Sequence, residues 1–418
     1  MSNVQTLKGF RDFLPQEKRK RDFVRGKVVE VFERFGFEPL ETPTLEYASL
    51  LLGKYGEEAD KLVYTFEDNG GRKVGLRYDQ TVPTARVLAQ YVNELPRFFR
   101  RYQIQNVFRA DKPQKGRYRE FTQCDADIFG STSPIADAEV LATIYFAVKN
   151  VGFPQVIIKI NDRQTLFKTF EKFAKETVSV FSIIQSIDKL DKQSVEEVIA
   201  ELVNKGLSQT ESEEVLLSVQ NAKASENLQD IMKIAKNFGI PTSSLEFTPS
   251  LARGLDYYTG MIFEIIIPEF TVGSCGGGGR FDNLINDLGG KDIPAVGFAI
   301  GFDRVVEAAE ALNLYPQEIY ESAKVFVTIF NKDLQQKSEE VAAFLRFKNI
   351  NTEIYVGEVS DKNQLDKQLK YADIKKIPYV VILGPEEAEK NEVTLKSLQT
   401  RTQQSVSVDK LPNLLNTK

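Results

Sequence analysis

The sequence predicts an α+β protein with a helical insertion and a separate C-terminal α/β domain, and three observations support this fold class. Short strand patterns separated by turn residues fill residues 38–129, which is typical of an antiparallel sheet. Residues 169–238 have a helical pattern, are rich in charge and are nearly free of glycine and proline. From residue 323 onward, strand and helix patterns alternate, which indicates a βαβαβ domain with a largely parallel sheet.

The first part of the chain, residues 1–168, is predicted to begin with a helix that starts at Pro15 and stops at Gly36. Proline is favoured at the first position of a helix and glycine just after its end. Apolar side chains recur at helical spacing between these limits: Phe23, Val24, Val28, Val31, Phe32 and Phe35. Further extended segments, strands and one helix are predicted in this order: residues 38–45, 62–66, 73–78, 82–94 (the helix), 101–109 and 119–129. The turn at residues 68–71 predicts a hairpin between the second and third of these.

Three further parts complete the predicted organisation. The helical insertion occupies residues 169–238, the sheet domain resumes over 239–321, and the α/β domain covers 322–418. In the resumed sheet domain we expect strands at 245–251 and 257–267, a glycine-dense loop at 273–279 and an apolar segment at 295–300. In the last domain we expect strands at 325–330, 352–356 and 379–383, with helices at 334–347 and 364–372.

Composition limits the class of protein. The 418 residues are 42% hydrophobic and 27% charged, an ordinary balance for a globular chain of two or three domains. No apolar run is long enough to cross a bilayer, and residues 1–21 lack the apolar core of a signal peptide. Two cysteines, Cys124 and Cys275, do not make a disulfide framework or a paired-cysteine zinc site. These features predict a cytoplasmic protein without a membrane partner and without a metal site built from side chains.

The chain contains no histidine. This excludes every nucleophile activated by histidine and removes the commonest general base. The net charge is −5, but residues 97–119 hold eight basic residues and one acid. Such a local excess of one sign predicts a partner or substrate that carries negative charge.

One predicted strand, residues 119–129, concentrates polar side chains on one face. Side chains alternate with period two, so one face carries Arg119, Phe121, Gln123, Asp125 and Asp127. The neighbouring strand brings Arg109 beside it. This arrangement suits a polyanion on the sheet with Phe121 as a stacking platform, although the solvent-facing side of a half-covered sheet would have the same pattern.

Three motifs in order along the chain indicate a family. They are the helix ending at Gly36 with Pro43 after it; Phe108-Arg109-Ala110-Asp111 with Gly116-Arg117-Tyr118-Arg119-Glu120-Phe121; and Gly297-Phe298-Ala299-Ile300-Gly301-Phe302-Asp303-Arg304. They resemble motifs 1, 2 and 3 of class II aminoacyl-tRNA synthetases, which implies the antiparallel sheet of that class and a homodimer formed through motif 1.

Further segments resemble histidyl-tRNA synthetases in particular. Two are similar to the histidine-specific signatures of that family, and one is similar to its amino-acid-binding loop: residues 251–260 (LARGLDYYTG), 277–282 (GGGRFD) and 76–81 (LRYDQT). The C-terminal domain resembles the family's anticodon-binding domain, so the likeness covers nearly the whole chain. It implies an enzyme that activates L-histidine with ATP and Mg²⁺ and transfers it to histidine tRNA.

The resemblance also implies residue roles. For ATP, Arg109 is implied at the α-phosphate, Arg117 at the outer phosphates, Phe121 against adenine and Arg304 against the nucleotide. For histidine, the implied residues are Asp79 and Thr81 at the amino group with Gln123 beside them, Asp127 and Tyr258 at the ring nitrogens, and Tyr257. Arg253 is implied at the α-phosphate as a catalytic residue together with Arg109, and it is also counted with the histidine site.

The chemistry agrees with a chain that lacks histidine. Adenylation needs no side-chain base, because the attacking carboxylate is already ionised, and its demands are alignment and screening of charge. The sequence departs from the family pattern by shorter acids at Asp111, Asp303, Asp79 and Asp127, which affects fine geometry rather than the reaction.

Other functions remain open at this point. The family includes a regulatory subunit of ATP phosphoribosyltransferase, but that form lacks the C-terminal domain and loses signature residues. A class II ligase for proline, threonine or glycine would not explain residues 253–260. A P-loop NTPase is disfavoured because no Lys-Ser/Thr follows the glycines at 276–279.

Overall fold

The computed structural model describes residues 4–52, 62–112, 118–253, 258–271, 273–288, 291–359 and 364–416. The chain divides into two compact units, residues 1–14 with 21–314 and residues 15–20 with 315–418. Within the described residues, no helix is both long enough and apolar enough to span a membrane. The four-part division predicted from the sequence stays a prediction.

An eight-stranded sheet forms the centre of the first unit, in the order β1-β5-β6-β11-β10-β9-β7-β8. Its strands are β1 Glu38–Pro39, β5 Phe99–Phe108, β6 Glu120–Phe129, β7 Ile157–Asp162, β8 Leu245–Phe247, β9 Met261–Ile266, β10 Gly276–Arg280 and β11 Ala295–Ile300. Neighbouring strands from β5 to β7 are antiparallel, whereas β1 and β8 join the two edges in parallel. The predicted antiparallel sheet is therefore present, with one short parallel strand at each edge.

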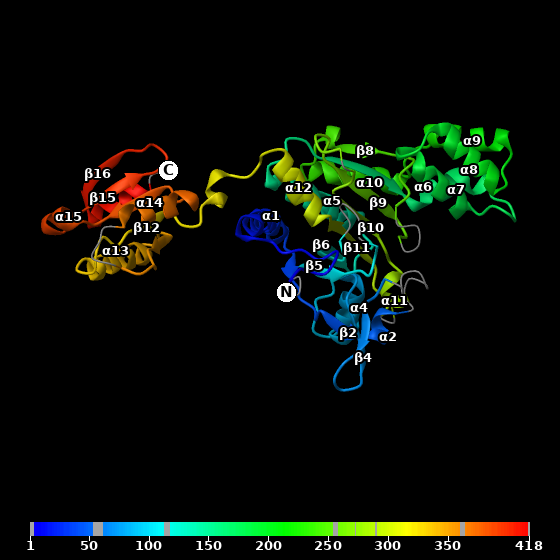
Figure 1. Ribbon diagram of the computed structural model, residues 1–418. Helices are drawn as coiled ribbons and strands as arrows, with labels where there is room; N and C mark the ends of the chain where they lie inside the picture. The colour runs from blue at the N-terminus through cyan, green and yellow to red at the C-terminus, as the bar shows by residue number, and fades with distance from the viewer. Residues whose placement is uncertain are drawn as a thin grey trace. The chain divides into compact units, whose positions relative to one another are not determined.

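The helices of this unit pack around that sheet and a smaller one of three strands (Figure 1). The long helices are α1 Pro15–Arg34, of which residues 21–34 belong to this unit, α4 Thr81–Gln90, α5 Pro134–Val151 and α12 Phe302–Ala311. Two single-turn helices are α2 Ala48–Leu51 and α11 Leu284–Asp287. The small sheet has the order β2-β4-β3, with β2 Leu45–Tyr47, β3 Thr65–Glu67 and β4 Lys73–Leu76. Helix α1 confirms its prediction: Val24, Val28, Val31 and Phe32 are fully buried, and Gly36 after its end has φ +74°.

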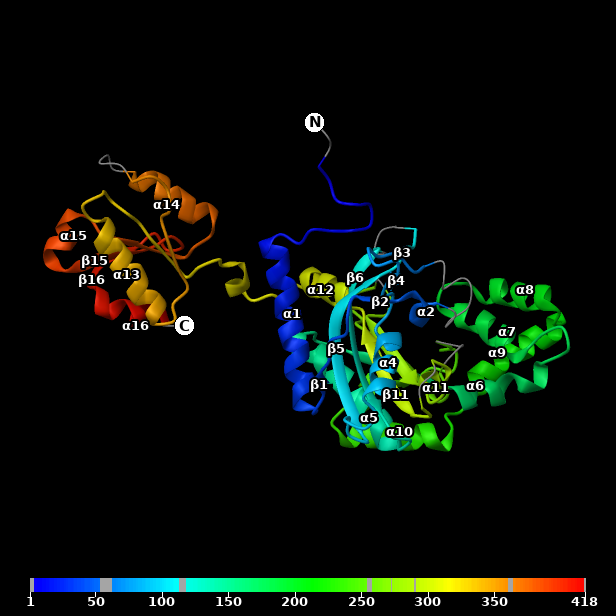
Figure 2. The ribbon, with the colours of Figure 1, turned by 90° about the horizontal axis from the view of Figure 1, so that it is seen from below.

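Helices fill the segment between β7 and β8. They are α6 Arg163–Phe170, α7 Val180–Ile187, α8 Val195–Lys205, α9 Gln209–Asn221 and α10 Glu226–Asn237, with a 3₁₀ turn at Asp188–Asp191. Ser179, Ser194, Ser208 and Ser225 cap four of them by accepting a backbone N–H. Figure 2 shows α6, α7, α8 and α9 gathered in one group, and α10 lies beside α5.

The second unit is a five-stranded sheet in the order β13-β12-β14-β15-β16, covered by helices. Its elements are β12 Val325–Val327, α13 Gln335–Phe347, β13 Thr352–Ile354, α14 Leu365–Ile374, β14 Tyr379–Ile382, α15 Pro385–Lys390, β15 Glu392–Ser397, β16 Gln403–Ser407 and α16 Leu411–Asn416. Strand β12 is parallel to β13 and β14, which confirms the βαβαβ prediction. The antiparallel strands β15 and β16, which extend this sheet, were not predicted from the sequence.

One sequence prediction in the first unit is wrong. Residues 273–279 were expected to form a loop, but residues 276–280 form β10, a fully buried strand between β9 and β11. Glycine is normally depleted in strands, but here the neighbours leave no room for side chains. A Cβ on Gly278 would overlap the carbonyl oxygen of Gly297 on β11.

Candidate active site

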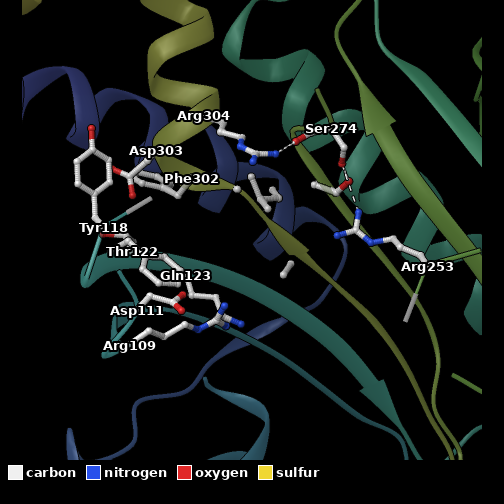
Figure 3. Close-up of a pocket in the computed structure, with 15 residues that line it drawn as sticks. Arg109, Asp111, Tyr118, Thr122, Gln123, Arg253, Ser274, Phe302, Asp303 and Arg304 are labelled. Atoms are coloured by element: carbon white, nitrogen blue, oxygen red, sulfur yellow. Dashed lines mark hydrogen bonds between the residues drawn. The ribbon is translucent and has the colours of Figure 1, made fainter. Parts of the chain in front are cut away.

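A cavity of about 360 Å³ lies above β6, β10 and β11, at the start of α12. Ten of the residues that line it are labelled in Figure 3: Arg109, Asp111, Tyr118, Thr122, Gln123, Arg253, Ser274, Phe302, Asp303 and Arg304. Phe121 also lines it. Five residues predicted from the sequence are thus brought together here: Arg109, Phe121, Gln123, Arg253 and Arg304.

Arg109 follows β5 directly and enters the cavity beside Phe121 of β6. Its Nε donates a hydrogen bond to the carbonyl of Tyr78 at 3.0 Å. The guanidinium carbon lies 5.1 Å from the centre of the Phe121 ring. The side chain is therefore fixed at its inner end, and its terminal nitrogens remain at the cavity wall, where an anion is able to meet them.

Arg253 and Arg304 reach the cavity from the opposite side (Figure 3). Arg253 Nη1 donates to Glu264 Oε1 at 2.8 Å and to Ser274 Oγ at 3.3 Å. Arg304 Nη1 donates to the carbonyl oxygen of Ser274 at 2.7 Å. Three permanent cations from separate elements thus face one cavity, and this favours a ligand with several negative charges.

Glycine is required where Arg253 lies against β10. A Cβ on Gly277 would overlap Arg253 Nη1 and would come within 2.6 Å of the Phe263 carbonyl oxygen. Only a residue without a side chain leaves this path open. The glycines of β10 at positions 276–279 therefore allow the close packing of the sheet and leave space for the Arg253 side chain.

Asp303, in the first turn of α12, joins the cavity to the N-terminal segment and α1. Its Oδ1 accepts from Arg11 Nη2 at 2.9 Å and from Arg21 Nη1 at 2.5 Å. Arg21 Nη2 also donates to Thr122 Oγ1 of β6 at 2.8 Å. The Arg11 guanidinium stacks on the ring of Tyr118, 3.3 Å from its centre.

Two buried carboxylates lie along β6 next to the cavity. Gln123 Nε2 donates to Asp125 Oδ2 at 2.8 Å. Within the described part of the chain, Gln123 Oε1 and Asp125 Oδ1 are buried and have no hydrogen-bond partner. Burial raises the pKa of Asp125 well above its ordinary value, Arg101 opposes this, and the charges of Asp127 and Asp79 raise it further.

Asp127 lies deeper in the sheet, paired with Arg101, whose side chain is 1% exposed. Burial raises the pKa of Asp127 to about 6, against the opposing effect of Arg101. Gly297 of β11 stands opposite Asp127, and a Cβ there would overlap Asp127 Oδ1. The ion pair with Arg101 and the close backbone of Gly297 therefore fix the position of the Asp127 carboxylate.

Four predicted histidine-site residues do not line the cavity: Asp79, Thr81, Asp127 and Tyr258. Asp79 Oδ1 accepts from the Val82 backbone N–H at 3.2 Å, and Thr81 begins α4. Tyr258 is buried, with its ring 6.5 Å from that of Phe281 and against Gly279. The predicted residues Arg117 and Tyr257 lie outside the described residues.

Two residues that contact Arg253, Ser274 and Glu264, were not predicted from the sequence. Glu264 is detectable in principle, because it is the single acid in the otherwise apolar strand Met261–Ile266. Ser274 carries no such signal within a glycine-rich segment. Among the residues that the structure describes, no three acids or cysteines gather in a way that would hold a metal ion.

Both cysteines lie beside cavity residues and are fully buried. Cys124 follows Gln123 on β6, and Cys275 follows Ser274. Burial raises the pKa of Cys124 well above its ordinary value and raises the pKa of Cys275 to about 11. Neither thiol is therefore a nucleophile near neutral pH.

Known proteins resemble the chain over nearly its whole length. The sequence profile of histidyl-tRNA synthetase matches residues 9–305, and that of an anticodon binding domain matches residues 324–418. Proteins named histidine–tRNA ligase from Cytophaga hutchinsonii and Wolinella succinogenes are 35% and 39% identical; the alignments cover 99% and 94% of this chain and 100% and 94% of those proteins.

Solved structures agree with these sequence matches. The crystal structure of histidyl-tRNA synthetase from a Nostoc species has a TM-score of 0.86 and 28% identity, with 99% of both chains covered. The apo enzyme from S. aureus, at 22% identity and a TM-score of 0.71, has the same fold. By its sequence profile and its relatives, the chain belongs to the histidyl-tRNA synthetase family.

Proposed function

We propose that this protein is a histidine–tRNA ligase, which uses ATP to form histidyl-adenylate and then transfers histidine to the 3′ end of histidine tRNA. The observation that carries the proposal is the group of three arginines, Arg109, Arg253 and Arg304, around one cavity beside the aromatic ring of Phe121. Fixed cations next to an aromatic ring suit a nucleoside triphosphate.

In the first step, the histidine carboxylate attacks the α-phosphorus of ATP, the bond to the β-phosphate oxygen breaks, and pyrophosphate leaves. The carboxylate is already ionised, so this step needs no general base. We assign Arg253 and Arg109 to the α-phosphate, where they screen the charge that develops. Phe121 stacks on adenine and Arg304 lies against the nucleotide. Arg117, which lies outside the described residues, is assigned to the outer phosphates, and Mg²⁺ enters with ATP as part of the substrate.

Histidine is assigned to the polar group along β6 and the start of α4. Gln123 Oε1 is buried without a partner in the described residues, and this supports a role in accepting a hydrogen bond from the substrate ammonium group, beside Asp79 and Thr81. Asp127 and Tyr258 are assigned to the two ring nitrogens, with Tyr257 and Arg253 completing the site. In the second step, the 3′-terminal hydroxyl of the tRNA attacks the adenylate carbonyl and AMP leaves.

We further propose a cytoplasmic homodimer. One face of the small sheet leaves Leu45, Tyr47 and Phe66 exposed by 40%, 59% and 48%. Tyr47 and Phe66 both pair with Val74, so they point to the same side. An apolar face of this kind fits a partner subunit, and sedimentation of the purified protein would reveal a monomer if the proposal is wrong.

Pyrophosphate exchange with each of the twenty amino acids tests the proposed activity. We expect exchange with histidine alone, at a rate well above the same reaction without an amino acid. Exchange with none of the twenty would favour a regulatory protein of this family. Exchange with a different amino acid would refute the assigned specificity while retaining the class of reaction.

A further inference from the structure

Ser274 connects two of the cavity arginines. Its hydroxyl accepts a hydrogen bond from Arg253 Nη1 at 3.3 Å, and its carbonyl accepts one from Arg304 Nη1 at 2.7 Å. Figure 3 shows Ser274 between the two guanidinium groups, with each bond drawn. A single residue therefore contacts both cations through two different oxygens.

The hydroxyl of Ser274 has a defined direction. Ser274 Oγ donates its proton to the carbonyl of Gly276 at 2.8 Å. With the proton engaged there, the oxygen offers a lone pair to Arg253. The hydroxyl acts as an oriented acceptor rather than as a freely rotating group.

The backbone around Ser274 is fixed on two sides. The Cys275 N–H donates to Ile265 of β9 at 2.8 Å, and the Gly301 N–H donates to the Cys275 carbonyl at 2.9 Å. These bonds tie the residue after Ser274 both to the sheet and to the start of α12. Because both neighbours are rigid elements, Ser274 is a firm support for a side chain that leans on it.

Arg253 has need of such a support. Its side chain is 36% exposed, and a long exposed side chain loses much conformational freedom when a ligand fixes it. Among the described residues it has two side-chain partners, Glu264 and Ser274. Both accept a hydrogen bond from the same nitrogen, Nη1. Glu264 supplies the charge that attracts the guanidinium, whereas Ser274 adds a second point that sets its direction. The other terminal nitrogen then stays available to a ligand in the cavity.

We infer that Ser274 is a positioning residue for adenylation, one that orients Arg253 through its hydroxyl and holds Arg304 through its carbonyl. The inference rests on the proposed function, because it assumes that Arg253 meets the α-phosphate. Preorganised charge stabilises a transition state more than a bound ground state. Loss of the hydroxyl should therefore lower kcat for exchange and leave KM for ATP and histidine nearly unchanged.

Two double-mutant cycles test this inference by pyrophosphate exchange. Ser274→Ala alone is expected to lower kcat about five- to tenfold, the effect of one lost hydrogen bond in such a site. In an Arg253→Gln background the same change should have less than about a twofold effect, because its target is gone. In an Arg304→Gln background it should keep its full effect, because Arg304 contacts a carbonyl that alanine retains. The Arg304 cycle is the matched control.

The outcomes are distinct. A wild-type rate for Ser274→Ala, or an equal loss in the Arg253→Gln background, overturns the inference, and so does a missing effect in the Arg304→Gln background. Ser274→Thr keeps an acceptor and should be near wild type, whereas Ser274→Cys should resemble alanine; this pair gives the same comparison if the alanine variant does not fold. Failure of wild-type protein to exchange with histidine would refute the proposed function instead.

Discussion

At the scale of single residues, the site depends on arginine. The chain has no histidine, so the cations that line the cavity are guanidinium groups, which stay charged at every working pH. Burial raises the pKa values of two carboxylates on β6, Asp125 and Asp127, and that of Asp127 reaches about 6. The charge of the guanidinium groups is therefore independent of pH, whereas the ionisation of Asp127 changes as the pH passes about 6.

Replacement of Arg253 tests the phosphate end. Arg253→Gln should lower the rate of adenylation by roughly a hundredfold or more, about 3 kcal/mol, because charge at the α-phosphate is no longer screened. Histidine affinity, measured by calorimetry, should change much less. The control is Arg346→Gln at an exposed position of α13 in the second unit, which should be fully active in exchange. Near-normal exchange by the Arg253 variant would remove it from the catalytic residues.

The pKa of Asp127 predicts how stability depends on pH. This pKa is about 6 in the folded protein against an ordinary value of 3.8, so the folded state binds the proton more tightly than the unfolded state. The contribution of Asp127 to the free energy of unfolding is therefore present below about pH 4 and is lost as the pH rises to about 6. Asp127→Asn lacks this titration.

Thermal unfolding of the ligand-free proteins measures the effect. The Tm of wild type minus that of Asp127→Asn should fall between pH 4 and pH 6 and should level off above that range. A difference that is constant with pH, or that rises, would contradict the assigned pKa.

At the scale of elements, the sequence predicted the helices and strands whose own pattern of apolar residues, glycine and proline agrees with the packing around them. Helix α1 was predicted nearly to its ends, because a proline, a glycine and a buried apolar stripe all agree. Strand β10 was missed because its glycines are set by contacts with β9, β11 and Arg253 that no local pattern reveals. At the site, the arginines were found through motifs. Ser274 was not found, because its role depends on the fold that places it between Arg253 and Arg304.

Glycine 277 offers a test of that account of β10. Gly277→Ala should destabilise the protein by about 1–3 kcal/mol, since the added methyl group overlaps Arg253 and the Phe263 carbonyl. It should also lower exchange activity, because Arg253 is displaced. Gly26→Ala is the matched control: it lies in α1 with no atom within 4 Å of the added Cβ, so it should raise stability by up to about 1 kcal/mol. The measurements are the Tm and the exchange rate of both variants. A Gly277→Ala protein with the stability and activity of wild type would contradict the steric argument.

At the scale of the whole molecule, the two structural units and the two profile matches divide the chain at a similar place. The units separate between Leu314 and Tyr315, and the matches leave residues 306–323 between them. All residues that line the candidate active site belong to the first unit. The proposed chemistry therefore needs no side chain from the second unit, whose profile match is to an anticodon binding domain.

The absence of histidine has a consequence for the whole chain. A ligase that loads histidine but contains none can still be translated when charged histidine tRNA is scarce, so its synthesis should continue during histidine starvation. The comparison is a variant with several histidines at exposed positions that leave activity unchanged. Pulse labelling during starvation should show faster synthesis of the natural chain. Equal synthesis would mean that the absence is compositional, in line with the absence of tryptophan and a methionine count of 3.

The burial of both cysteines makes the protein a convenient subject for fluorescence. Cys124 and Cys275 are the chain's two thiols, both enclosed and held protonated near neutral pH. Maleimide dyes need an accessible thiolate. They should therefore leave the two native cysteines unmodified and react with cysteines introduced on the surface. Dyes on helix α9 and beside the cavity would then report whether the distance between them changes while the protein turns over, with both native cysteines retained.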